Sequence, residues 1–305
     1  MRRVAGLAGG LLLLALPAFA VEPLALTEVA PGLLVHVGRH EEFTAANAGG
    51  IANLAVIIGE EAVAVVDSGG SRQEGEALLA AIRARSSAPI RYVIDTHVHP
   101  DHLLGNAAFV DTGAVVVGHA KLAAQLAEAG PYYLKAMREL LGESFAGTEI
   151  VPPSLPVADR LRLDLGHRPL ELRAWPTAHT ATDLSVLDLR TGTLIAGDLL
   201  FLERLPVVDG SLLGWLAVMD ELAQIPAVRV VPGHGPASAP WPDALAPQRA
   251  YLSSLRDQVR DELARNRTLE QAVEEVAPPP GRSWLLEREN HARNVTASFT
   301  ELEWE

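Results

Sequence analysis

The chain has 305 residues and a mass of 32.5 kDa, of which 49% are apolar and 21% are charged. This composition is typical of a globular protein with one large domain or two small ones, and it excludes extensive disorder. The formal net charge of −13 leaves no broad basic surface, so we expect no nucleic-acid partner. The absence of cysteine excludes disulfides, thiolate metal ligands and cysteine nucleophiles.

The first twenty residues have the layout of a secretory signal peptide. Arg2 and Arg3 precede an apolar run from Val4 to Leu16, and small residues follow Pro17 at the usual cleavage spacing. The apolar run is short for a membrane span, which leaves an uncleaved anchor as the less favoured alternative. We expect cleavage after Ala20, a periplasmic location and no stable membrane anchor after cleavage.

The mature chain alternates predicted strands and helices. In its first half, strands are rich in valine, isoleucine and alanine, and helices show the spacing of one buried face. The predicted strands are 33–38, 53–58, 62–67, 91–95 and 114–117. The predicted helices are 73–85 and 121–129, the second of which we expect Gly130 and Pro131 to end.

After a proline-rich connection over 147–160, the same pattern begins again. The predicted strands are 161–165, 170–175, 184–189, 193–196 and 228–231, and the predicted helices are 212–224 and 246–265. Two such halves predict two sheets packed face to face with helices outside, a four-layer α/β sandwich in a single domain over 21–265. A tail over 266–305 is expected to add short helices on the outside of this domain.

Histidine and aspartate side chains gather where predicted strands end. His97, His99, Asp101 and His102 lie within six residues, directly after the strand over 91–95. Extended residues two apart point to the same side, so His97 and His99 can share a metal. A bend at Pro100 allows Asp101 and His102 to face a second metal. Four ligand-type side chains at this spacing are a strong signal for a metal site.

Three further side chains of the same kind follow later strands: His179, Asp198 and His234. Loops at one edge of an α/β sheet converge, so we expect these residues to join the first cluster. Gly197 and Gly233, which precede Asp198 and His234, allow tight turns and close backbone approach.

These motifs together resemble the zinc hydrolases of the metallo-β-lactamase fold. The early segment from Val66 to Gly70 also resembles the first motif of that superfamily. The resemblance implies an αβ/βα sandwich with two zinc ions between the sheets. It implies that one zinc is held by His97, His99 and His179, and the other by Asp101, His102 and His234. It further implies that Asp198 bridges the two ions and that Asp67 orients the site without binding metal.

Ligand chemistry favours zinc, because nitrogen and carboxylate ligands without sulfur suit this ion. Two zinc ions would generate a metal-bound hydroxide near neutral pH. We expect Asp101 to be the catalytic residue that orients this hydroxide and handles its proton.

Other residues carry weaker signals. His40 and Phe43 lie in a loop that overhangs the metals in this fold, although a solvated turn is the favoured interpretation of His40. The segment 131–145, with Tyr132, Tyr133 and Lys135, is an equally good candidate for a lid or a peripheral helix.

Several more positions have simple expected roles. We expect the segment 201–204 after Asp198 to line the pocket, and the turn at 209–211 to cap the next helix. Core or surface roles are expected for a set of histidines, His36, His119, His167 and His291, and packing roles for the tryptophans Trp175, Trp241, Trp284 and Trp304.

A narrower resemblance rests on His40-Glu41-Glu42, the segment from Gly49 to Asn53, the segment from Pro176 to Thr180 and the C-terminal Glu-Leu-Glu-Trp-Glu. These segments are similar to the quinoprotein relay system zinc metallohydrolases, which are SoxH-like. The resemblance implies a periplasmic enzyme accessory to a quinoprotein (PQQ) dehydrogenase or sulfur-oxidation system, acting on a small ester, thioester or lactone-like compound.

Two alternatives stay open. A β-lactamase-type amide hydrolase that needs no cysteine ligand is the alternative enzyme. A metal-loaded binding or maturation factor without turnover is the alternative from another class, although a complete ligand set favours catalysis.

Overall fold

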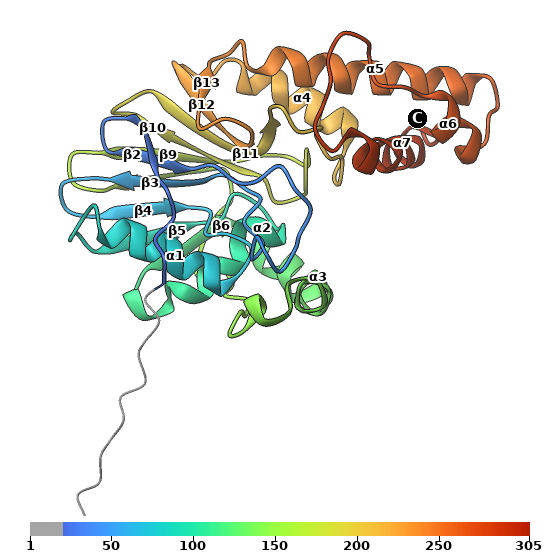
Figure 1. Cartoon of the computed structure of the whole chain (residues 1–305). Helices are drawn as coiled ribbons and strands as arrows, with labels where there is room; N and C mark the ends of the chain where they lie inside the picture. The colour runs from blue at the N-terminus through green and yellow to red at the C-terminus, as the bar shows by residue number, and fades with distance from the viewer. Residues whose placement is uncertain (1–20) are drawn as a thin grey trace, which may run out of the picture.

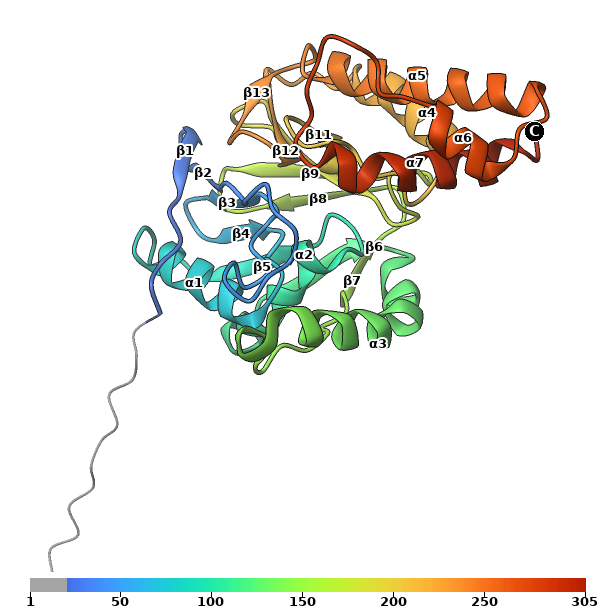
Figure 2. The same cartoon turned by 45° about the vertical axis from the view of Figure 1, so that its right-hand side comes forward.

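The computed structural model describes residues 21–305, so the predicted signal peptide lies outside the described residues. Two β-sheets pack face to face, with α1 and α3 outside one sheet and α4 and α5 outside the other (Figures 1 and 2). This is the predicted αβ/βα sandwich in a single domain.

The first sheet follows chain order across its width. Its strands are β1 (Thr27–Ala30), β2 (Leu33–His36), β3 (Leu54–Ile58), β4 (Val63–Val66), β5 (Ile90–Ile94), β6 (Val115–His119) and β7 (Leu155–Val157). The strands from β4 to β7 pair in parallel, so their carboxyl ends meet at one edge of the sheet.

The second sheet runs in the order β13-β12-β11-β10-β9-β8. Its strands are β8 (Arg160–Asp164), β9 (Pro169–Ala174), β10 (Leu184–Asp188), β11 (Thr193–Phe201), β12 (Arg229–His234) and β13 (Ala239–Pro240). The β11 and β12 strands pair in parallel and bring two of the predicted ligands, Asp198 and His234, to the same end.

The helices fall into two groups. The first half contributes α1 (Arg72–Arg83), α2 (Pro100–Leu103) and α3 (Leu122–Leu141), with short 3₁₀ turns η1 (Leu104–Ala108), η2 (Val110–Thr112) and η3 (Gly142–Phe145). The second half contributes α4 (Leu212–Leu222), α5 (Leu245–Ala264), α6 (Leu269–Glu275) and α7 (Glu287–Leu302).

The apolar core lies in layers that follow this architecture. Alternate side chains of both sheets meet between them, including Val35, Ile57, Leu172 and Val186, all fully buried. A second cluster joins the outer face of the second sheet to α4, α5 and α7. Burial of apolar surface on both faces of each sheet is the main stabilising contribution in such layers.

One predicted boundary is wrong. Gly130 and Pro131 do not end a helix, because α3 continues through them to Leu141. The helix buries Leu126 before Pro131 and Met137 after it, so one apolar face packs along its whole length. This packing outweighs the cost of about 3 kcal/mol for a proline inside a helix.

Several strands differ from prediction as well. The connection over 147–160 contains β7, where Pro156 is accommodated because β7 is the edge strand of its sheet. The strand predicted to end at Ala196 continues to Phe201, so Asp198 lies within β11. The sequence does not predict β1, since its four residues show no clear apolar alternation.

Two expectations about the segment 266–305 are also wrong. It contains a 16-residue helix, α7, whose Val295 and Phe299 enter the same core as β11 and α4. Trp304 is not a packing residue, because 83% of its surface is exposed. Among residues 21–305, no helix is both long and apolar enough to cross a membrane.

Candidate metal centre

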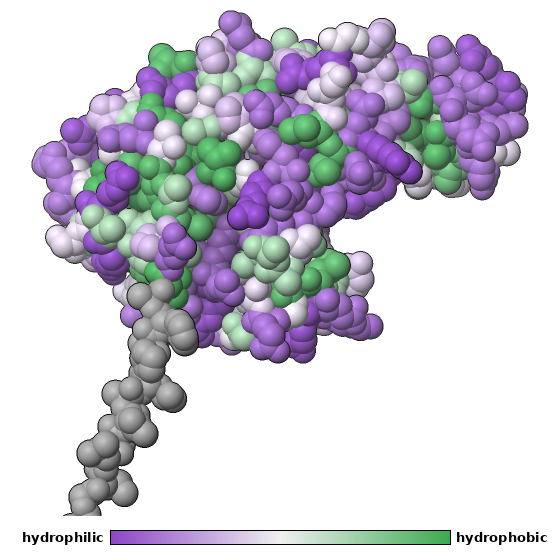
Figure 3. Space-filling model, in the orientation of Figure 1, coloured by the Kyte–Doolittle hydropathy of each residue, from purple (hydrophilic) through white to green (hydrophobic). Residues whose placement is uncertain are grey.

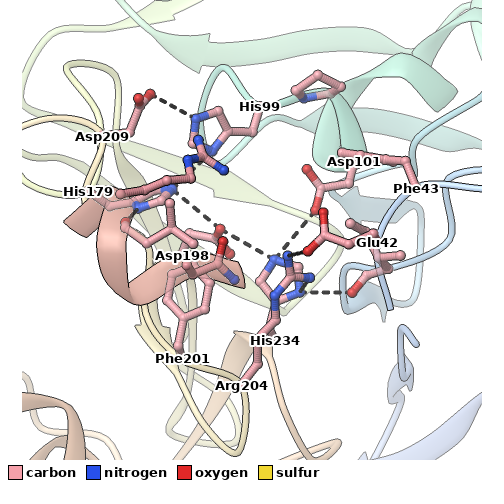
Figure 4. Close-up of a pocket in the computed structure, with 15 residues that line it drawn as sticks. Glu42, Phe43, His99, Asp101, His179, Asp198, Phe201, Arg204, Asp209 and His234 are labelled. Carbon is pink, nitrogen blue, oxygen red and sulfur yellow. Dashed lines mark hydrogen bonds and ion pairs between the residues drawn. The ribbon is translucent and has the colours of Figure 1, made fainter. Parts of the chain in front are cut away.

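The seven predicted ligands converge on one point at the ends of the central strands. His97 follows β5, His99 precedes α2, and α2 carries Asp101 and His102 in its first turn. The second sheet supplies three ligands, namely His179 after β9, Asp198 within β11 and His234 at the end of β12. Figure 4 shows five of these side chains directed toward a shared pocket.

The side chains form two groups whose ligand atoms lie within 4.8 Å of one another in each group. The first holds His97, His99, His179 and Asp198, and the second holds Asp101, His102 and His234. In the first, His99 Nδ1 lies 3.0 Å from both His97 Nε2 and His179 Nε2.

Asp198 lies between the two groups. Its Oδ2 is 3.3 Å from His179 Nε2 in the first group and 3.4 Å from His234 Nε2 in the second. Its Oδ1 is 3.2 Å from His102 Nε2. The carboxylate therefore faces both groups, the position that a bridging ligand needs.

The rear nitrogen of every ligand histidine has a partner that fixes the ring. His97 Nδ1 pairs with Thr96 Oγ1 at 3.0 Å, and His99 Nε2 with Asp209 Oδ2 at 3.0 Å. The remaining three donate Nδ1–H to an oxygen, His102 to Asp67 Oδ2 at 2.8 Å, His179 to Val207 O at 2.7 Å and His234 to Ile51 O at 2.8 Å. Such rear contacts are typical of metal-binding histidines, whose orientation they set.

Asp67 does not enter either group, and its contacts match an orienting role. It follows β4 with a positive φ of 60°, and it accepts hydrogen bonds from Thr96 N and Thr96 Oγ1, each at 2.8 Å. It thereby holds His102 and the residue before His97 together.

Most of these groups have the protonation state in which a side chain binds a metal cation. Burial lowers the pKa of His97 well below its usual range and that of His179 to about 4, so both are neutral at pH 7. Burial opposes ionisation of Asp198, but His234 and His102 outweigh it and hold the pKa of Asp198 well below its usual range. Neutral imidazole and ionised carboxylate are the forms that bind metal.

His99 and His102 behave differently. Burial lowers their pKa values, but neighbouring carboxylates outweigh it, chiefly Asp209 for His99 and Asp198 for His102, so both pKa values are raised. Protons on these rings balance the buried carboxylates. A metal cation would replace that positive charge and release the protons.

Two buried atoms point to the same conclusion. Among the described residues, His102 Nε2 and Asp198 Oδ1 make no hydrogen bond of normal geometry, although they lie 3.2 Å from each other as an ion pair. Buried polar atoms are normally satisfied, so each such exception requires an explanation. Both atoms face the centre of the cluster, where a metal would satisfy them, and the donor set therefore fits a metal site.

A cavity of about 140 Å³ opens over the cluster. Its lining includes His99, Asp101, His179, Asp198 and His234. Figure 3 shows this face of the molecule hollowed between the C-terminal helices and α3. The cavity therefore gives a small substrate group access to the ligands from solvent.

The weaker candidates for the pocket wall divide into residues that line the cavity and residues that do not. Phe43 lines the cavity, as do Phe201 and Arg204 from the segment after Asp198. His40 is outside the lining, and its Nε2 lies 3.2 Å from Glu203 Oε2.

The segment 131–145, for which a lid and a peripheral helix were equal candidates, also stays outside the cavity lining. Tyr132, Tyr133 and Lys135 belong to α3, and Tyr132 is 70% exposed. Tyr133 is partly buried against the apolar cluster that includes Leu126 and Met137, and burial is the first cause of its pKa being raised to about 12.

Sequence reasoning missed three functional candidates. Asp209 was expected only to form a turn before α4, which Ser211 does cap through Gly214 N, yet Asp209 also binds His99. Asn290 and Arg293 come from α7, in the tail assigned to the outside, and both line the cavity. No local pattern around these residues marks them, because only tertiary packing brings them to the site.

The four-layer sandwich and the paired His/Asp groups at its strand ends define a metallohydrolase. Residues 48–234 match the family model of the Metallo-beta-lactamase superfamily. This match spans more than half of the chain, and the chain belongs to that superfamily.

Solved structures share the fold at low sequence identity. A metallo-beta-lactamase from Pontibacter korlensis is 22% identical, with a TM-score of 0.62 over 75% of this chain and 99% of that one. The sec-alkylsulfatase Pisa1 from Pseudomonas sp. is 17% identical, with a TM-score of 0.68 over 92% of this chain and 50% of that one.

A curated relative matches over a short stretch. The linear primary-alkylsulfatase of Pseudomonas sp. (strain ATCC 19151) is 38% identical over 65 residues. This stretch is 21% of the present chain and only 12% of the relative. The chain thus belongs to this superfamily, and the proteins to which it is similar include alkylsulfatases.

Proposed function

We propose that this protein is a dinuclear zinc hydrolase of small ester-type substrates, namely an ester, a thioester or a lactone. The single observation that supports this proposal best is the pair of ligand groups with Asp198 between them, open to a small cavity. Imidazole and carboxylate ligands without thiolate suit zinc.

Bound zinc ions would supply a water molecule of lowered pKa and positive charge beside the developing oxyanion. His97, His99 and His179 would hold one ion, and Asp101, His102 and His234 the other, with Asp198 shared. The small cavity would admit the ester group and exclude bulk solvent from it.

Asp101 is the best-placed group to handle a proton. It is buried, it lines the cavity, and its Oδ2 lies 3.4 Å from His234 Nε2. We assign it the task of orienting the attacking water and accepting its proton at Oδ1, since Oδ2 is the oxygen that faces His102 and His234. The same oxygen can then return the proton to the leaving group.

The cellular setting belongs to the proposal as well. The signal-peptide layout of the first twenty residues supports export to the periplasm. The SoxH-like motifs support a role beside a quinoprotein dehydrogenase or sulfur-oxidation system. A fusion of residues 1–20 to a reporter should be exported and cleaved after Ala20.

Sulfate-ester hydrolysis is a second candidate. The 65-residue match to an alkylsulfatase favours it, as does the buried cation Arg204 in the cavity wall. A sulfate ester carries a negative charge beside the bond that breaks, and a neighbouring guanidinium would stabilise that charge.

A hydrolysis panel tests these alternatives on the zinc-loaded protein, residues 21–305. It contains an aryl ester, a glutathione thioester, a lactone, an aryl sulfate and a chromogenic β-lactam, each with and without chelator. We expect chelator-sensitive turnover of an ester-type compound. Turnover of the β-lactam alone would instead establish the amide hydrolase.

The non-catalytic alternative needs its own control. His179→Ala removes a predicted ligand without changing the outer surface, because His179 is 1% exposed. If the wild-type protein turns over a substrate and the metal-depleted His179→Ala variant does not, the result supports an enzyme. No turnover by the wild-type protein, with partner binding retained by His179→Ala, would contradict it.

A further inference from the structure

A second cavity, of about 520 Å³, lies between the segment that precedes β1, the loop that follows β2 and the start of α1. The segment before β1 runs beside α1 (Figures 1 and 2), where Leu24 N donates to Ala77 O at 3.1 Å. No residue that lines this cavity is a proposed metal ligand, and none lines the cavity over the metal centre. The second cavity is therefore separate from the site described above.

Glu74 places a buried carboxyl group in the wall of this cavity. It lies in the first turn of α1 and is 4% exposed. Its Oε2 accepts from Gly70 N at 2.7 Å, a contact that supports the helix cap formed by Ser71. Its Oε1 makes no hydrogen bond among residues 21–305. Capping of α1 therefore explains one oxygen of Glu74 and leaves the other without a partner.

The two oxygens of Glu74 face different glycines. A Cβ on Gly69 would lie 2.5 Å from Oε2, whereas a Cβ on Gly50 would lie 2.9 Å from Oε1. Gly50 lines the cavity and Gly69 does not. The oxygen without a partner is therefore the one on the cavity side.

His36 and Glu22 add two more hydrogen-bond acceptors to the wall. His36 Nδ1 lies 3.1 Å from Ala25 O, and a carbonyl oxygen only accepts, so Nδ1 carries the proton. Burial lowers the pKa of His36, which keeps the ring neutral at pH 7 and leaves a lone pair on Nε2. Glu22 is exposed and supplies a carboxylate.

The wall offers few donors in return. The Asn47 amide is fully engaged, because its Nδ2 donates to Glu42 O at 2.9 Å and to Glu41 Oε2 at 3.2 Å. Arg39 is the cation of the wall, but its side chain is 59% exposed and lies 4.0 Å from Glu41 Oε2. Solvent therefore weakens its charge. A ligand that complements this wall must bring its own N–H donors.

We propose that this cavity binds a primary alkylammonium ion, with the charged end at Glu74 and the alkyl chain against Leu24, Val37 and Ala77. An ammonium group presents three N–H donors, which suit the acceptors of the wall. The apolar side chains account for the remainder of the ligand, because they remove its chain from water. The inference goes beyond the proposed function, since it assigns a second ligand to a different part of the molecule.

The charge of the ligand also suits the protonation of Glu74. Burial raises the pKa of Glu74 to about 8, the Gly70 N–H opposes this shift, and the charges of Asp101 and His102 have smaller, opposite effects. Without a ligand the carboxyl group keeps its proton at neutral pH. A neighbouring ammonium favours the ionised form, so the proton passes to solvent and the bound pair has no net charge.

Calorimetric titration tests the site on the zinc-loaded protein, residues 21–305, with two probes of equal chain length. At pH 8, n-pentylamine carries a positive charge and n-pentanol is neutral. We expect the Kd of n-pentylamine to be about tenfold lower, because a hydrogen bond between charged groups is stronger than one between neutral groups. Equal Kd values for the two probes, or no binding of n-pentylamine, would overturn the proposal.

Two carboxylate variants locate the charged end. Glu74→Gln keeps the size of the side chain and should weaken binding of n-pentylamine about tenfold while leaving that of n-pentanol unchanged. Glu22→Gln should weaken it only about twofold, because Glu22 is exposed. Glu139→Gln, at an exposed position of α3 outside the cavity, is the matched control. An n-pentylamine Kd that Glu74→Gln leaves unchanged would overturn the assignment.

A third variant tests the alkyl end without altering Glu74. Val37 is 39% exposed and lies in the loop after β2, so its replacement does not open the core. We expect Val37→Ser to weaken binding of both probes about threefold, through loss of apolar contact. Unchanged Kd values for both probes would show that the ligand lies elsewhere and would overturn the proposal.

Amines also bind zinc, so the metal centre needs a control. The titration is repeated after a chelator has removed the zinc, and we expect the same Kd, because the cavity contains no proposed ligand. Binding that disappears with the zinc and does not respond to Glu74→Gln belongs to the metal centre and would overturn the proposal. The outcome does not depend on hydrolysis of any substrate, so it is independent of the proposed function.

Discussion

At the scale of single residues, the site depends on contacts behind the ligands as much as on the ligands. Five histidines direct one nitrogen inward and fix the other on an oxygen. Asp209 differs from the other partners because it comes from the loop before α4 and 48% of its side chain is exposed. It can therefore be changed with little risk to the core.

Replacing Asp209 should weaken metal binding. Asp209→Asn keeps the size of the side chain but removes the charge that orients His99. We expect zinc affinity to fall by about 10- to 100-fold, as for other partners of metal-binding histidines. Competition with a chromogenic chelator measures this affinity, with the exposed Asp257→Asn as control. Equal affinities for Asp209→Asn and the wild-type protein would contradict the orienting role.

Gly233 has a steric role beside Asp198. A Cβ at this position would lie 1.9 Å from Asp198 Oδ1 and 2.7 Å from Gly197 C. Gly233→Ala should displace the carboxylate and reduce bound zinc below two ions per chain, while the circular dichroism of the fold persists. A variant that binds zinc like the wild-type protein would show that Asp198 is not required where the structure places it.

Glu74 gives a prediction about pH. Burial raises its pKa to about 8, and Oε1 has no partner, although Oε2 accepts from Gly70 N at 2.7 Å. The folded protein keeps this carboxyl protonated between pH 4.5 and 8, whereas the unfolded chain ionises it. The unfolded state then binds fewer protons, so stability falls as pH rises through this window.

Glu74→Gln removes this proton linkage. The free energy of unfolding of the wild-type protein, relative to that of Glu74→Gln, should fall by a few kcal/mol between pH 5 and pH 8. Urea unfolding at the two pH values measures the difference. A constant difference would show that Glu74 ionises normally in the folded protein.

At the scale of elements, α7 is joined to the first turn of α4. Glu301 accepts from Ser211 Oγ at 2.5 Å and from Leu212 N at 2.7 Å. Ser211 in turn caps α4 by accepting from Gly214 N at 2.8 Å. The Glu301 carboxylate thus accepts hydrogen bonds from donors at the start of α4 and connects the C-terminal helix α7 to α4.

Removing this carboxylate should destabilise the fold. We expect Glu301→Ala to lower the free energy of unfolding by about 1–2 kcal/mol, because it leaves two donors without an acceptor. Glu303→Ala, at a neighbouring exposed position, is the control. The effects of Ser211→Ala and Glu301→Ala should not add, since the two side chains share one hydrogen bond.

Secondary-structure elements and ligands could be predicted from the sequence wherever a short run of neighbouring residues carries the pattern. Apolar runs and turn residues located most strands, and the spacing of His97, His99, Asp101 and His102 located the ligand cluster. Prediction of the elements from the sequence failed where tertiary packing determines whether a helix or strand forms. α3 passes through Pro131 because its apolar face packs on both sides, and β7 forms because a parallel neighbour, β6, accepts it. Neither cause is visible in a short window of sequence.

At the scale of the whole molecule, the C-terminal segment belongs to the same core as the second sheet. Val295, Phe299 and Leu302 of α7 join the cluster that includes Tyr251 and Trp215. Asn294 also donates to Pro206 O at 2.7 Å and to Tyr251 Oη at 2.8 Å. The predicted tail therefore completes the wall of the cavity as well as the core.

Truncation tests this integration. Deletion of residues 266–305 should expose the apolar side of α5 and yield protein that is aggregated or unfolds at a much lower temperature. Soluble yield and the thermal midpoint measure the effect. A truncated chain as stable as residues 21–305 would show that the tail is a separate unit.

We propose that the seven side chains gathered where the two sheets meet hold two zinc ions. Metal stoichiometry tests it most directly: residues 21–305 are stripped with chelator, titrated with zinc, dialysed and assayed for bound metal by elemental analysis. We expect about two zinc ions per chain for the wild-type protein and at most one for His179→Ala. A wild-type protein that retains no zinc, or a His179→Ala variant that retains two, would contradict it.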